Sequence, residues 1–413
     1  MPTSARTRIA AALGGVTSAT SRLLRRGGGS VIGAKVTLAL APKALDELAA
    51  GRRIAVVTGT NGKSTTTALL AAACSAGGHV VASNIEGSNL RSGIVALLGS
   101  RRARGTDLAV LEIDELAMPS LLPSFDAPVV VLLNLSRDQL DRFGEVRTIA
   151  AEWRRALGAQ AVTVVANADD PLVVFGASAA SDVTFVGVGL RWRQDAASCP
   201  NCGRQIQREP VGRDWWCECG LRRPDALELD GNDLLLSDGR RVAVEPGVPG
   251  HHNVGNAALA VVAAMKLGVD VPVAVDALRS VRSVAGRYRT ITVGATRARL
   301  LLAKNPAGWG ELLAMIDGEK TPLILGINAR IADGKDPSWL WDVEFEQLRG
   351  RRVIAVGDRA ADLAVRLRYA EVDCDVQVGP ALDALERYDG PELDLLLNYT
   401  VFADLVRAVG VAE

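Results

Sequence analysis

A glycine-rich turn with a lysine and two hydroxyl residues lies between an apolar run at 54–57 and an Ala/Leu-rich stretch. Glycines let backbone N–H groups approach phosphate oxygens, the lysine neutralises them, and a serine or threonine hydroxyl is a ligand for Mg²⁺. The spacing is Gly-x-x-Gly-Lys-Ser, shorter than the general pattern because Val57 occupies the first glycine's place. With a strand before it and a helix after it, we expect this turn to bind nucleotide phosphates through Gly59, Thr60, Asn61, Gly62, Lys63, Ser64 and Thr65.

Three carboxylates follow the apolar run at 107–113. The carboxyl end of a parallel strand beside a phosphate loop is where a Mg²⁺ ligand belongs. Alternation along the strand puts Glu112 and Asp114 on the same side, and Glu115 is within reach from the following turn. We expect Glu112 to hold Mg²⁺ together with Ser64, and Glu115 is our second choice.

Four of the six cysteines fall within 21 residues, in the pattern Cys-x₂-Cys-x₁₄-Cys-x-Cys. Two thiolate pairs on tight turns are the usual way to present four sulfurs to Zn²⁺, and four sulfurs leave no open position for catalysis. The second pair is one residue short of Cys-x₂-Cys, so a distorted, redox-active or metal-free ribbon stays open. We expect a reducing compartment and a structural zinc bound by Cys199, Cys202, Cys217 and Cys219.

Short apolar runs separated by helical stretches begin near residue 51. Such runs are typical of parallel strands covered by helices on both faces, which indicates α/β domains. The first series lies at 53–58, 107–113, 127–135, 161–166 and 183–188, and the second at 299–303, 322–326, 353–356, 372–378 and 393–398.

The regions between these series complete the expected organisation. Composition shifts abruptly to Cys, Trp, Arg and Gly near 191–224, alternating residues at 226–244 predict strands, and helices are expected at 251–266 and 272–284. We therefore predict a helical lead-in at 1–50, a P-loop ATPase domain at 51–290 with a ribbon inserted at 195–224, and a Rossmann-like α/β domain at 291–413.

The overall charge is balanced, with 47 Lys plus Arg and 47 Asp plus Glu. No overall field therefore draws the chain onto nucleic acid or an anionic membrane. No apolar run approaches the roughly 18–20 residues that a membrane span needs, so we expect a cytoplasmic protein. The arginine-rich first fifty residues predict a helix that either docks on the next domain, which we favour, or touches a membrane surface.

Three segments closely resemble the Mur ligase superfamily, which includes peptidoglycan precursor ligases and folylpolyglutamate synthase. They are Val-Thr-Gly-Thr-Asn-Gly-Lys-Ser-Thr-Thr at 57–66, Asn-Ala-Asp-Asp at 167–170 and Gly-His-His-Asn-Val-Gly-Asn-Ala at 250–257. The resemblance implies an ATP-dependent ligase whose nucleotide also meets Asn167, His252, Asn253 and Asn256. Arg287, near the domain boundary, is a candidate to reach a phosphate when the domains close.

Within the superfamily, the chain resembles the MurT family, the ligase-like subunits of lipid II isoglutaminyl synthases. The four-cysteine ribbon, Ala-Lys-Asn-Pro-Ala-Gly-Trp at 303–309 and Asp-Gly-Lys-Asp-Pro-Ser-Trp-Leu-Trp-Asp at 333–342 carry this resemblance. It implies amidation of the D-glutamate α-carboxylate in lipid II, through an acyl phosphate, at the inner face of the membrane. It also implies a GatD-type glutamine amidotransferase partner, whose catalytic histidine is oriented by Asp342, with Asp336 and Asp333 as further candidates.

Two departures from ordinary Mur ligases limit which of their properties can be expected in this chain. Only about fifty residues precede the phosphate loop, so UDP recognition of the usual kind is not expected, and Gln139 replaces the histidine of an Asp-His-x-Asp stretch that serves a second Mg²⁺. Asn84, Glu86 and Asn89 are substrate-binding candidates or ordinary turn residues. A ligase adding an amino acid to a soluble carboxylate such as a folate stays as the alternative, and a non-catalytic nucleotide-binding scaffold is disfavoured.

Overall fold

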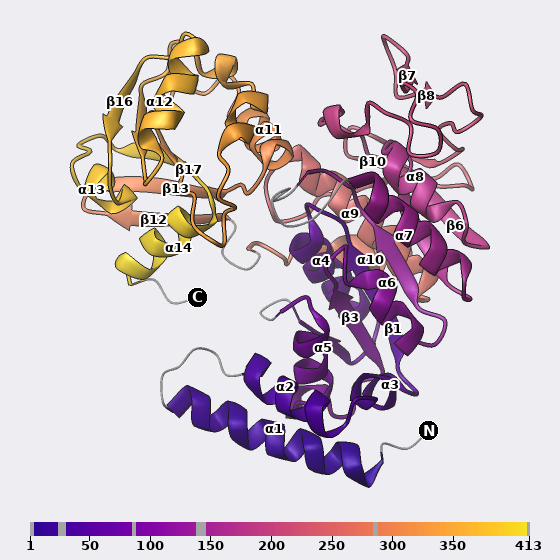
Figure 1. Cartoon of the computed structure of the whole chain (residues 1–413). Coiled ribbons are helices and arrows are strands. Elements are labelled where there is room, and N and C mark those ends of the chain that lie inside the picture. The colour runs from indigo at the N-terminus through magenta and orange to yellow at the C-terminus, as the bar shows by residue number, and fades with distance from the viewer. Residues whose placement is uncertain (1–3, 24–29, 85–87, 138–145, 284–287, 411–413) are drawn as a thin grey trace. The chain divides into compact units, whose positions relative to one another are not determined.

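A computed structural model of the chain divides into two compact units, Met1–Leu135 with Val146–Arg282, and Ser136–Glu145 with Ser283–Glu413. The split at 282/283 lies eight residues before the sequence-based boundary, and the short stretch after Leu135 is grouped with the C-terminal unit. The structure describes residues 4–23, 30–84, 88–137, 146–283 and 288–410 (Figure 1), and the side chains of 21–23 and 30 are left out of the description.

The first unit is built on a sheet in which the described residues form nine strands, in the order β11-β10-β9-β6-β5-β4-β1-β3-β2. The strands from β2 to β9 pair in parallel, and β10 and β11 add an antiparallel edge. The strands are β1 (Arg53–Thr58), β2 (Val81–Ser83), β3 (Leu108–Glu112), β4 (Val129–Leu132), β5 (Thr163–Asn167), β6 (Asp182–Gly187), β9 (Leu227–Asp230), β10 (Asp233–Leu235) and β11 (Arg241–Ala243).

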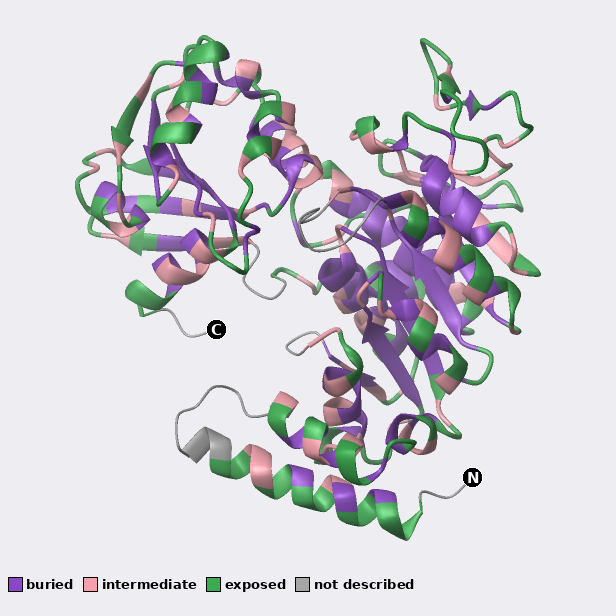
Figure 2. Cartoon of the chain, in the orientation of Figure 1, coloured by how far each residue is buried: buried purple, intermediate pink, exposed green. Residues whose placement is uncertain are grey.

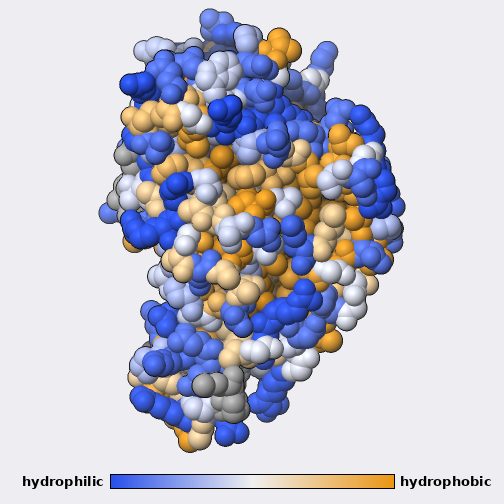
Figure 3. All heavy atoms as spheres, turned by 90° about the vertical axis from the view of Figure 1, so that its right-hand side faces the viewer, coloured by the Kyte–Doolittle hydropathy of each residue, from blue (hydrophilic) through white to orange (hydrophobic). Residues whose placement is uncertain are grey.

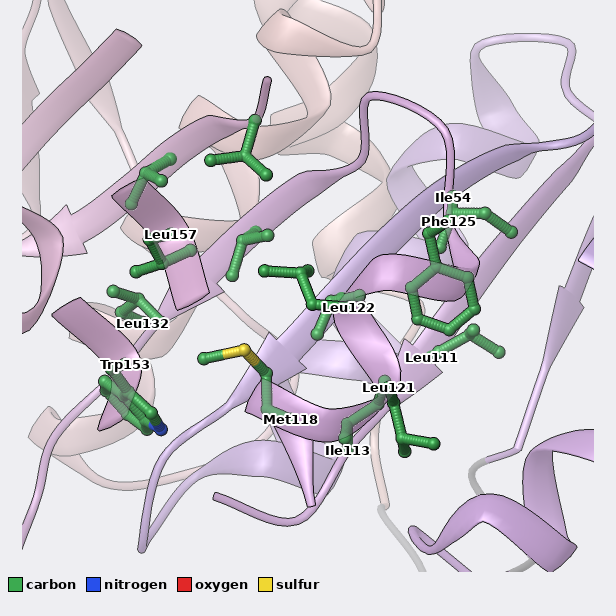
Figure 4. Close-up of a cluster of buried hydrophobic side chains, with 14 of the residues drawn as sticks. Ile54, Leu111, Ile113, Met118, Leu121, Leu122, Phe125, Leu132, Trp153 and Leu157 are labelled. Carbon is green, nitrogen blue, oxygen red and sulfur yellow. The ribbon is translucent and has the colours of Figure 1, made fainter. Parts of the chain in front are cut away.

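Helices cover both faces of this sheet, because its central strands bury nearly every side chain. One face packs on α4 (Lys63–Ala76), α9 (His251–Lys266) and α10 (Val271–Leu278). The other packs on α5 (Arg91–Leu98), α6 (Met118–Leu121), α7 (Val146–Gly158) and α8 (Pro171–Ala177). Figure 4 shows part of this second core, where Met118, Leu122 and Trp153 lie among the strand side chains. Short 3₁₀ turns lie at Arg101–Ala103, Leu122–Ser124 and Gln194–Ala196.

Three helices precede the sheet and belong to the first unit: α1 (Ala5–Leu23), α2 (Ser30–Leu40) and α3 (Ala44–Ala49). Helix α1 packs along α2, and both α2 and α3 pack on α5. The described residues of this segment are therefore mostly helical, and they pack on the domain that follows. Among the described residues, no helix is long and apolar enough to cross a membrane.

The C-terminal unit is a second α/β sheet, with strand order β12-β13-β17-β14-β15-β16 and only β12 antiparallel. Its two apolar cores lie on opposite faces of the sheet, one under α11 and α12 and the other under α13 and α14. The elements are β12 (Tyr288–Val293), β13 (Thr296–Leu302), α11 (Pro306–Met315), β14 (Leu323–Gly326), 3₁₀ turns at Ser338–Asp342 and Phe345–Leu348, β15 (Val353–Val356), α12 (Ala360–Tyr369), β16 (Cys374–Gln377), α13 (Ala381–Glu386), β17 (Glu392–Leu397) and α14 (Tyr399–Ala408).

Every apolar run that the sequence offers as a strand contains one, so the prediction of an α/β fold with parallel sheets is correct. Two elements differ. Helix α10 ends at Leu278, six residues before the predicted end, and β12 was not predicted. Strand β12 is an edge strand with mostly polar, half-exposed residues, so it lacks the continuous apolar run that identifies buried strands.

Candidate active site

The phosphate loop has the backbone that its glycines predict. Gly59 has φ +140°, and a Cβ there would lie 2.9 Å from the Asn134 carbonyl oxygen. Gly62 has φ +86° at the first position before α4, and a Cβ there would lie 2.6 Å from Asn256 Oδ1. Positive φ and close approach together require glycine at both positions. Helix α4 therefore begins directly after this turn, with Gly62 in place of a capping side chain, and a helix N-terminus of this kind favours an anion.

A residue that sequence reasoning passed over holds the loop in place. Asn134, just after β4, accepts a hydrogen bond from the Asn61 backbone N–H through Oδ1 (3.0 Å) and donates through Nδ2 to the Asn61 carbonyl (3.0 Å). Its own carbonyl accepts from the Thr60 N–H at 2.9 Å. The sequence did contain a signal for this role: Asn134 is an amide at the carboxyl end of β4, the strand next to β1. Neighbouring parallel strands end at the same edge of a sheet, so this amide could be expected near the loop.

Lys63, the first residue of α4, is buried and folds back over the loop. Its Nζ donates to the carbonyls of Gly59 (2.6 Å) and Thr60 (3.1 Å) and lies 2.8 Å from Glu115 Oε2. Burial raises the pKa of Glu115, and the nearby Lys63 ammonium opposes this rise. The structure thus pairs Lys63 with the second-choice carboxylate, and Trp153 Nε1 donates to the Glu115 carbonyl at 2.8 Å.

Ser64 and Glu112, the predicted magnesium ligands, are in contact. The Ser64 hydroxyl donates to Glu112 Oε2 at 2.7 Å, and both residues are buried. Asn84 positions this carboxylate, because its amide exchanges two 2.8 Å hydrogen bonds with the backbone of Glu112. Asn89 Nδ2 lies 3.4 Å from Glu112 Oε1. Asn84 therefore supports the strand end, whereas Glu86 lies outside the described residues.

The donor set fits a magnesium ion. A serine hydroxyl and a carboxylate are hard oxygen ligands, and Mg²⁺ in nucleotide sites keeps few protein ligands besides water and phosphate. The hydrogen bond of 2.7 Å brings both oxygens to one point beside the N-terminus of α4. Thr65 is buried in the same turn of α4 and Thr66 donates to the Gly62 carbonyl, so the hydroxyl that faces Glu112 is that of Ser64.

The Asn-x-Asp-Asp segment ends β5 and serves the local structure. Asn167 is buried and accepts from the Asp169 N–H at 2.9 Å, and Asp169 pairs with Arg223 of the following insertion at 2.7 Å. Asp170 caps α8 and also accepts from the Leu135 N–H at 2.9 Å. Burial raises the pKa of Asp170 to about 6, against the lowering effect of these N–H donors. These hydrogen bonds do not join Asn167 to the phosphate loop. Its contact with the nucleotide therefore stays a prediction.

The start of α9 lies against the phosphate loop. Asn256, which fills the space beside Gly62, donates to Asn253 Oδ1 at 3.1 Å, and Asn253 donates to the Pro249 carbonyl. Burial lowers the pKa of His252 to about 4, so this ring is neutral at neutral pH and does not act as a cation toward phosphate. Arg287 and Gln139 lie outside the described residues.

The four clustered cysteines come together in the insertion that carries β7 (Gln207–Arg208) and β8 (Trp215–Trp216). Their sulfurs all lie within 4.8 Å of one another, and the distances from Cys199 to Cys219 and from Cys202 to Cys217 are 3.6 and 3.4 Å. Tetrahedral Zn–S bonds of about 2.3 Å separate the sulfurs by about 3.8 Å. The shortened second pair therefore does not prevent a site of the right size.

The predicted Asp342 lies on a pocket of the C-terminal unit that Lys304, Asn305 and Trp339 also line. Its Oδ2 is 3.2 Å from Arg137 Nη2, and both side chains are partly exposed. Asp333, in contrast, is buried and accepts from the Thr400 N–H and hydroxyl. Asp336 accepts from the Ser338 N–H at 2.8 Å and caps the turn.

The fold and the phosphate site together define a Mur ligase-type protein. The Mur ligase middle domain model matches residues 57–264, and the MurT ligase C-terminal model matches residues 302–402. Among solved structures, a pseudomurein peptide ligase type C from Methanothermus fervidus is similar with a TM-score of 0.67 and 19% identity, covering 91% of this chain and 84% of that one. This likeness concerns the fold.

Two curated relatives narrow the family. The chain is 31% identical to the lipid II isoglutaminyl synthase (glutamine-hydrolyzing) subunit MurT of Streptococcus pneumoniae (strain ATCC BAA-255 / R6), over 92% of each chain. It is 30% identical to the subunit of the same name of Staphylococcus aureus (strain COL), over 79% of each. The chain belongs to the MurT family of Mur ligases.

Proposed function

We propose that this chain is the ATP-dependent synthetase subunit of a lipid II isoglutaminyl synthase. It converts the α-carboxylate of D-glutamate in the lipid II stem peptide into an amide, with ammonia that a glutaminase partner releases. The contact between Ser64 and Glu112 beside the phosphate loop is the observation that carries this proposal, because a ligase of this class must hold Mg²⁺-ATP for phosphoryl transfer. The identity of the substrate is proposed from the membership of the chain in the MurT family.

The residues of the loop have distinct parts in the reaction. The open N-terminus of α4 and the backbone N–H groups of the loop bind the triphosphate. When ATP binds, the Lys63 ammonium leaves the Glu115 carboxylate and pairs with phosphate oxygens instead. There it stabilises the negative charge on the transferred phosphoryl group. Transfer of the γ-phosphoryl group to the carboxylate gives an acyl phosphate and releases ADP. Ammonia then attacks the acyl carbon, displaces inorganic phosphate and loses a proton to form the amide.

Two metals fit the chain. Mg²⁺ held by Ser64 and Glu112 would neutralise the β and γ oxygens of ATP. Zn²⁺ held by Cys199, Cys202, Cys217 and Cys219 would be structural, since four thiolates leave no position for a substrate. Trp215, whose Nε1 donates to the Ala168 carbonyl at 3.1 Å, joins the ribbon to the nucleotide domain. Around the nucleotide we further assign contacts to Asn167, His252, Asn253, Asn256 and Arg287.

A separate GatD-type subunit supplies the ammonia. Cys74 is buried in the core, where burial raises the pKa of its thiol to about 12, and this disfavours the thiolate that a glutaminase needs. Asp342 is our choice for the carboxylate that orients the partner's histidine, because Asp333 is occupied by Thr400 and Asp336 by the turn. Beside it, the exposed rings of Trp341 and Tyr369 stack edge-on at 5.2 Å, and aromatic residues of this kind are typical of interfaces.

The reaction takes place at the inner face of the membrane, where the lipid-linked substrate is presented. The test is to purify the chain together with a glutaminase subunit and to supply lipid II, Mg²⁺-ATP and glutamine. Mass spectrometry distinguishes a carboxylic acid from its primary amide. The proposal predicts amide that depends on both ATP and glutamine and is lost in Lys63→Ala; a competent complex that leaves lipid II unchanged refutes it.

A further inference from the structure

The balanced charge of the chain conceals a basic segment at its start. The first 45 residues contain seven basic residues and no aspartate or glutamate, whereas the other 368 residues contain 40 basic and 47 acidic ones. A patch of one sign attracts a surface of the opposite sign whatever the net charge of the whole protein. The basic residues are Arg6, Arg8, Arg22, Arg25, Arg26, Lys35 and Lys43.

Helix α1 exposes its large apolar side chains. Ile9, Leu13 and Val16 are 62%, 49% and 65% exposed. Their spacing of four and three residues places them in one stripe along the helix. Figure 2 shows the exposed residues along α1. A surface helix of a globular protein normally turns such a stripe toward the core, so α1 has the reverse arrangement.

The side of α1 that packs on α2 is made of small residues. Thr7, Ala10 and Gly14 are buried there, and a Cβ on Gly14 would lie 2.4 Å from the Gly33 carbonyl oxygen. The Thr37 hydroxyl also donates to the Ala10 carbonyl at 3.2 Å. The two helices are too close for a larger side chain between them. The apolar stripe therefore cannot rotate into this interface without separating the helices.

Helix α2 fixes the pair to the nucleotide domain. Its Ala34 is buried in the same core as Ile94 and Leu98 of α5. Arg91 of α5 also donates to the Pro42 carbonyl at 3.2 Å. The outward stripe of α1 is thus a fixed surface of the nucleotide domain, and Ile32 of α2 adds a further apolar side chain that is 46% exposed.

We propose that the outward face of α1 docks on the surface of an anionic lipid bilayer. The stripe of Ile9, Leu13 and Val16 would enter the boundary between headgroups and acyl chains, and the exposed Arg6 and Arg8 of the same helix would meet lipid phosphates. Apolar residues also reach the surface elsewhere, for example on the face in Figure 3, but the α1 stripe lies within the first 45 residues, which contain no acidic residue. The biological use of this docking rests on the proposed function, because the substrate of that reaction is lipid-linked.

The test measures binding of the full chain, with its partner subunit, to vesicles without lipid II. One set contains phosphatidylglycerol and phosphatidylcholine in equal parts, and the other contains phosphatidylcholine alone. We expect cosedimentation with the first set, weakened by salt, and a decrease of about tenfold or more in the partition coefficient for Ile9→Gln/Leu13→Gln/Val16→Gln. Glutamine favours helices, so circular dichroism and thermal unfolding of this variant should match the wild type.

A matched triple variant controls for loss of exposed apolar surface. Val211, Val365 and Val378 are 90%, 51% and 73% exposed outside the first 45 residues, and their replacement by glutamine should leave vesicle binding unchanged. The proposal is overturned if the α1 variant binds vesicles as well as the wild type does. It is also overturned if the wild type is a dimer and the α1 variant is a monomer, since a second copy would then cover the stripe. Amidation of detergent-solubilised lipid II is measured separately, so a failure of docking is distinct from a failure of the proposed function.

Discussion

The Lys63 ammonium and the Glu115 carboxylate form an ion pair of 2.8 Å whose side chains are 9% and 10% exposed. Such a pair is costly to break from one side, because the remaining charge stays buried. It also keeps Lys63 on the carbonyls of Gly59 and Thr60 until another anion is available. In the proposed function, Lys63 is therefore already beside the phosphate loop before ATP binds, because the Glu115 carboxylate holds it there.

Replacing Lys63 by alanine should abolish ATP-dependent amidation and make stability depend on pH. Glu115 already has a raised pKa from burial, and without Lys63 it loses the cation that opposes the rise. A carboxyl with a raised folded-state pKa stabilises the fold below its unfolded pKa and loses this contribution as pH rises through the folded value. Lys63→Ala should therefore be destabilised by about 3–5 kcal/mol at pH 8 and clearly less at pH 5. Urea unfolding of both proteins at the two pH values measures this, and an equal difference at both would contradict the role of Glu115.

The contact between Ser64 and Glu112 predicts a metal-dependent loss of turnover. Ser64→Ala removes one of the two proposed oxygen ligands, and Glu112→Gln keeps an oxygen but removes its negative charge; we expect turnover to fall about 100-fold or more in each. The decisive readout is the Mg²⁺ concentration that gives half-maximal rate, which should rise in Ser64→Ala. Asn89→Ala is the matched control, because Asn89 Nδ2 lies 3.4 Å from the same carboxylate and should change the Mg²⁺ requirement little.

Asn134 offers a test of the loop conformation rather than of its charges. Asn134→Ala removes the two side-chain hydrogen bonds to Asn61. We expect the KM for ATP to rise about thirtyfold, since two bonds are lost and each contributes on the order of 1 kcal/mol. Asn134→Asp keeps the acceptor for the Asn61 N–H but turns a carboxylate oxygen toward the Asn61 carbonyl, so its KM should rise at least as much as in Asn134→Ala. A larger effect on kcat than on KM in both variants would mean that Asn134 touches the reacting groups.

Much of this arrangement could be predicted because it depends on local sequence. The loop from Gly59 to Ser64 is continuous, and its glycines are required by positive φ and close approach, so the motif itself specifies the backbone. The carboxylate Glu112 ends a buried strand, and strand alternation gives its direction. The four cysteines form two short turns, and this spacing determines that their sulfurs can meet.

The partners that lie far apart in the chain could not be predicted. Lys63 and Glu115 are separated by 52 residues, and which carboxylate meets the lysine depends on how the turn after β3 packs under Trp153. Asn134 lies five residues before Gln139, in a stretch that we compared only with a metal-binding segment, whereas its amide serves the loop. The reversed face of α1 depends on the close crossing of Gly14 and Gly33, which periodicity alone cannot indicate.

The cysteine cluster predicts a metal whose loss loosens the ribbon. Cys217→Ser should lower the zinc content of the purified chain from about one ion to less than half, since removing a thiolate weakens the site greatly. Buried Trp215 lies in the same small core as Cys199 and Cys217, so its fluorescence should shift toward that of exposed tryptophan. Cys374→Ser, outside the cluster, should change neither signal, and full zinc content in Cys217→Ser would argue against a four-thiolate site.

The position of Asp342 predicts a defect that ammonia can bypass. If this carboxylate orients the partner's histidine, Asp342→Asn should lower glutamine-dependent amidation about 100-fold, as in other sites where the orienting carboxylate is removed. The ATP site is intact in this variant, so amidation with ammonium chloride in place of glutamine should continue at the wild-type rate. Asp336→Asn is the matched control, because Asp336 caps the same turn and its replacement should leave both activities unchanged.

Arg137 pairs with Asp342 at 3.2 Å in the isolated chain and competes for the same carboxylate. Arg137→Gln should therefore keep glutamine-dependent amidation. If this variant loses glutamine-dependent amidation, Arg137 as well as Asp342 positions the partner.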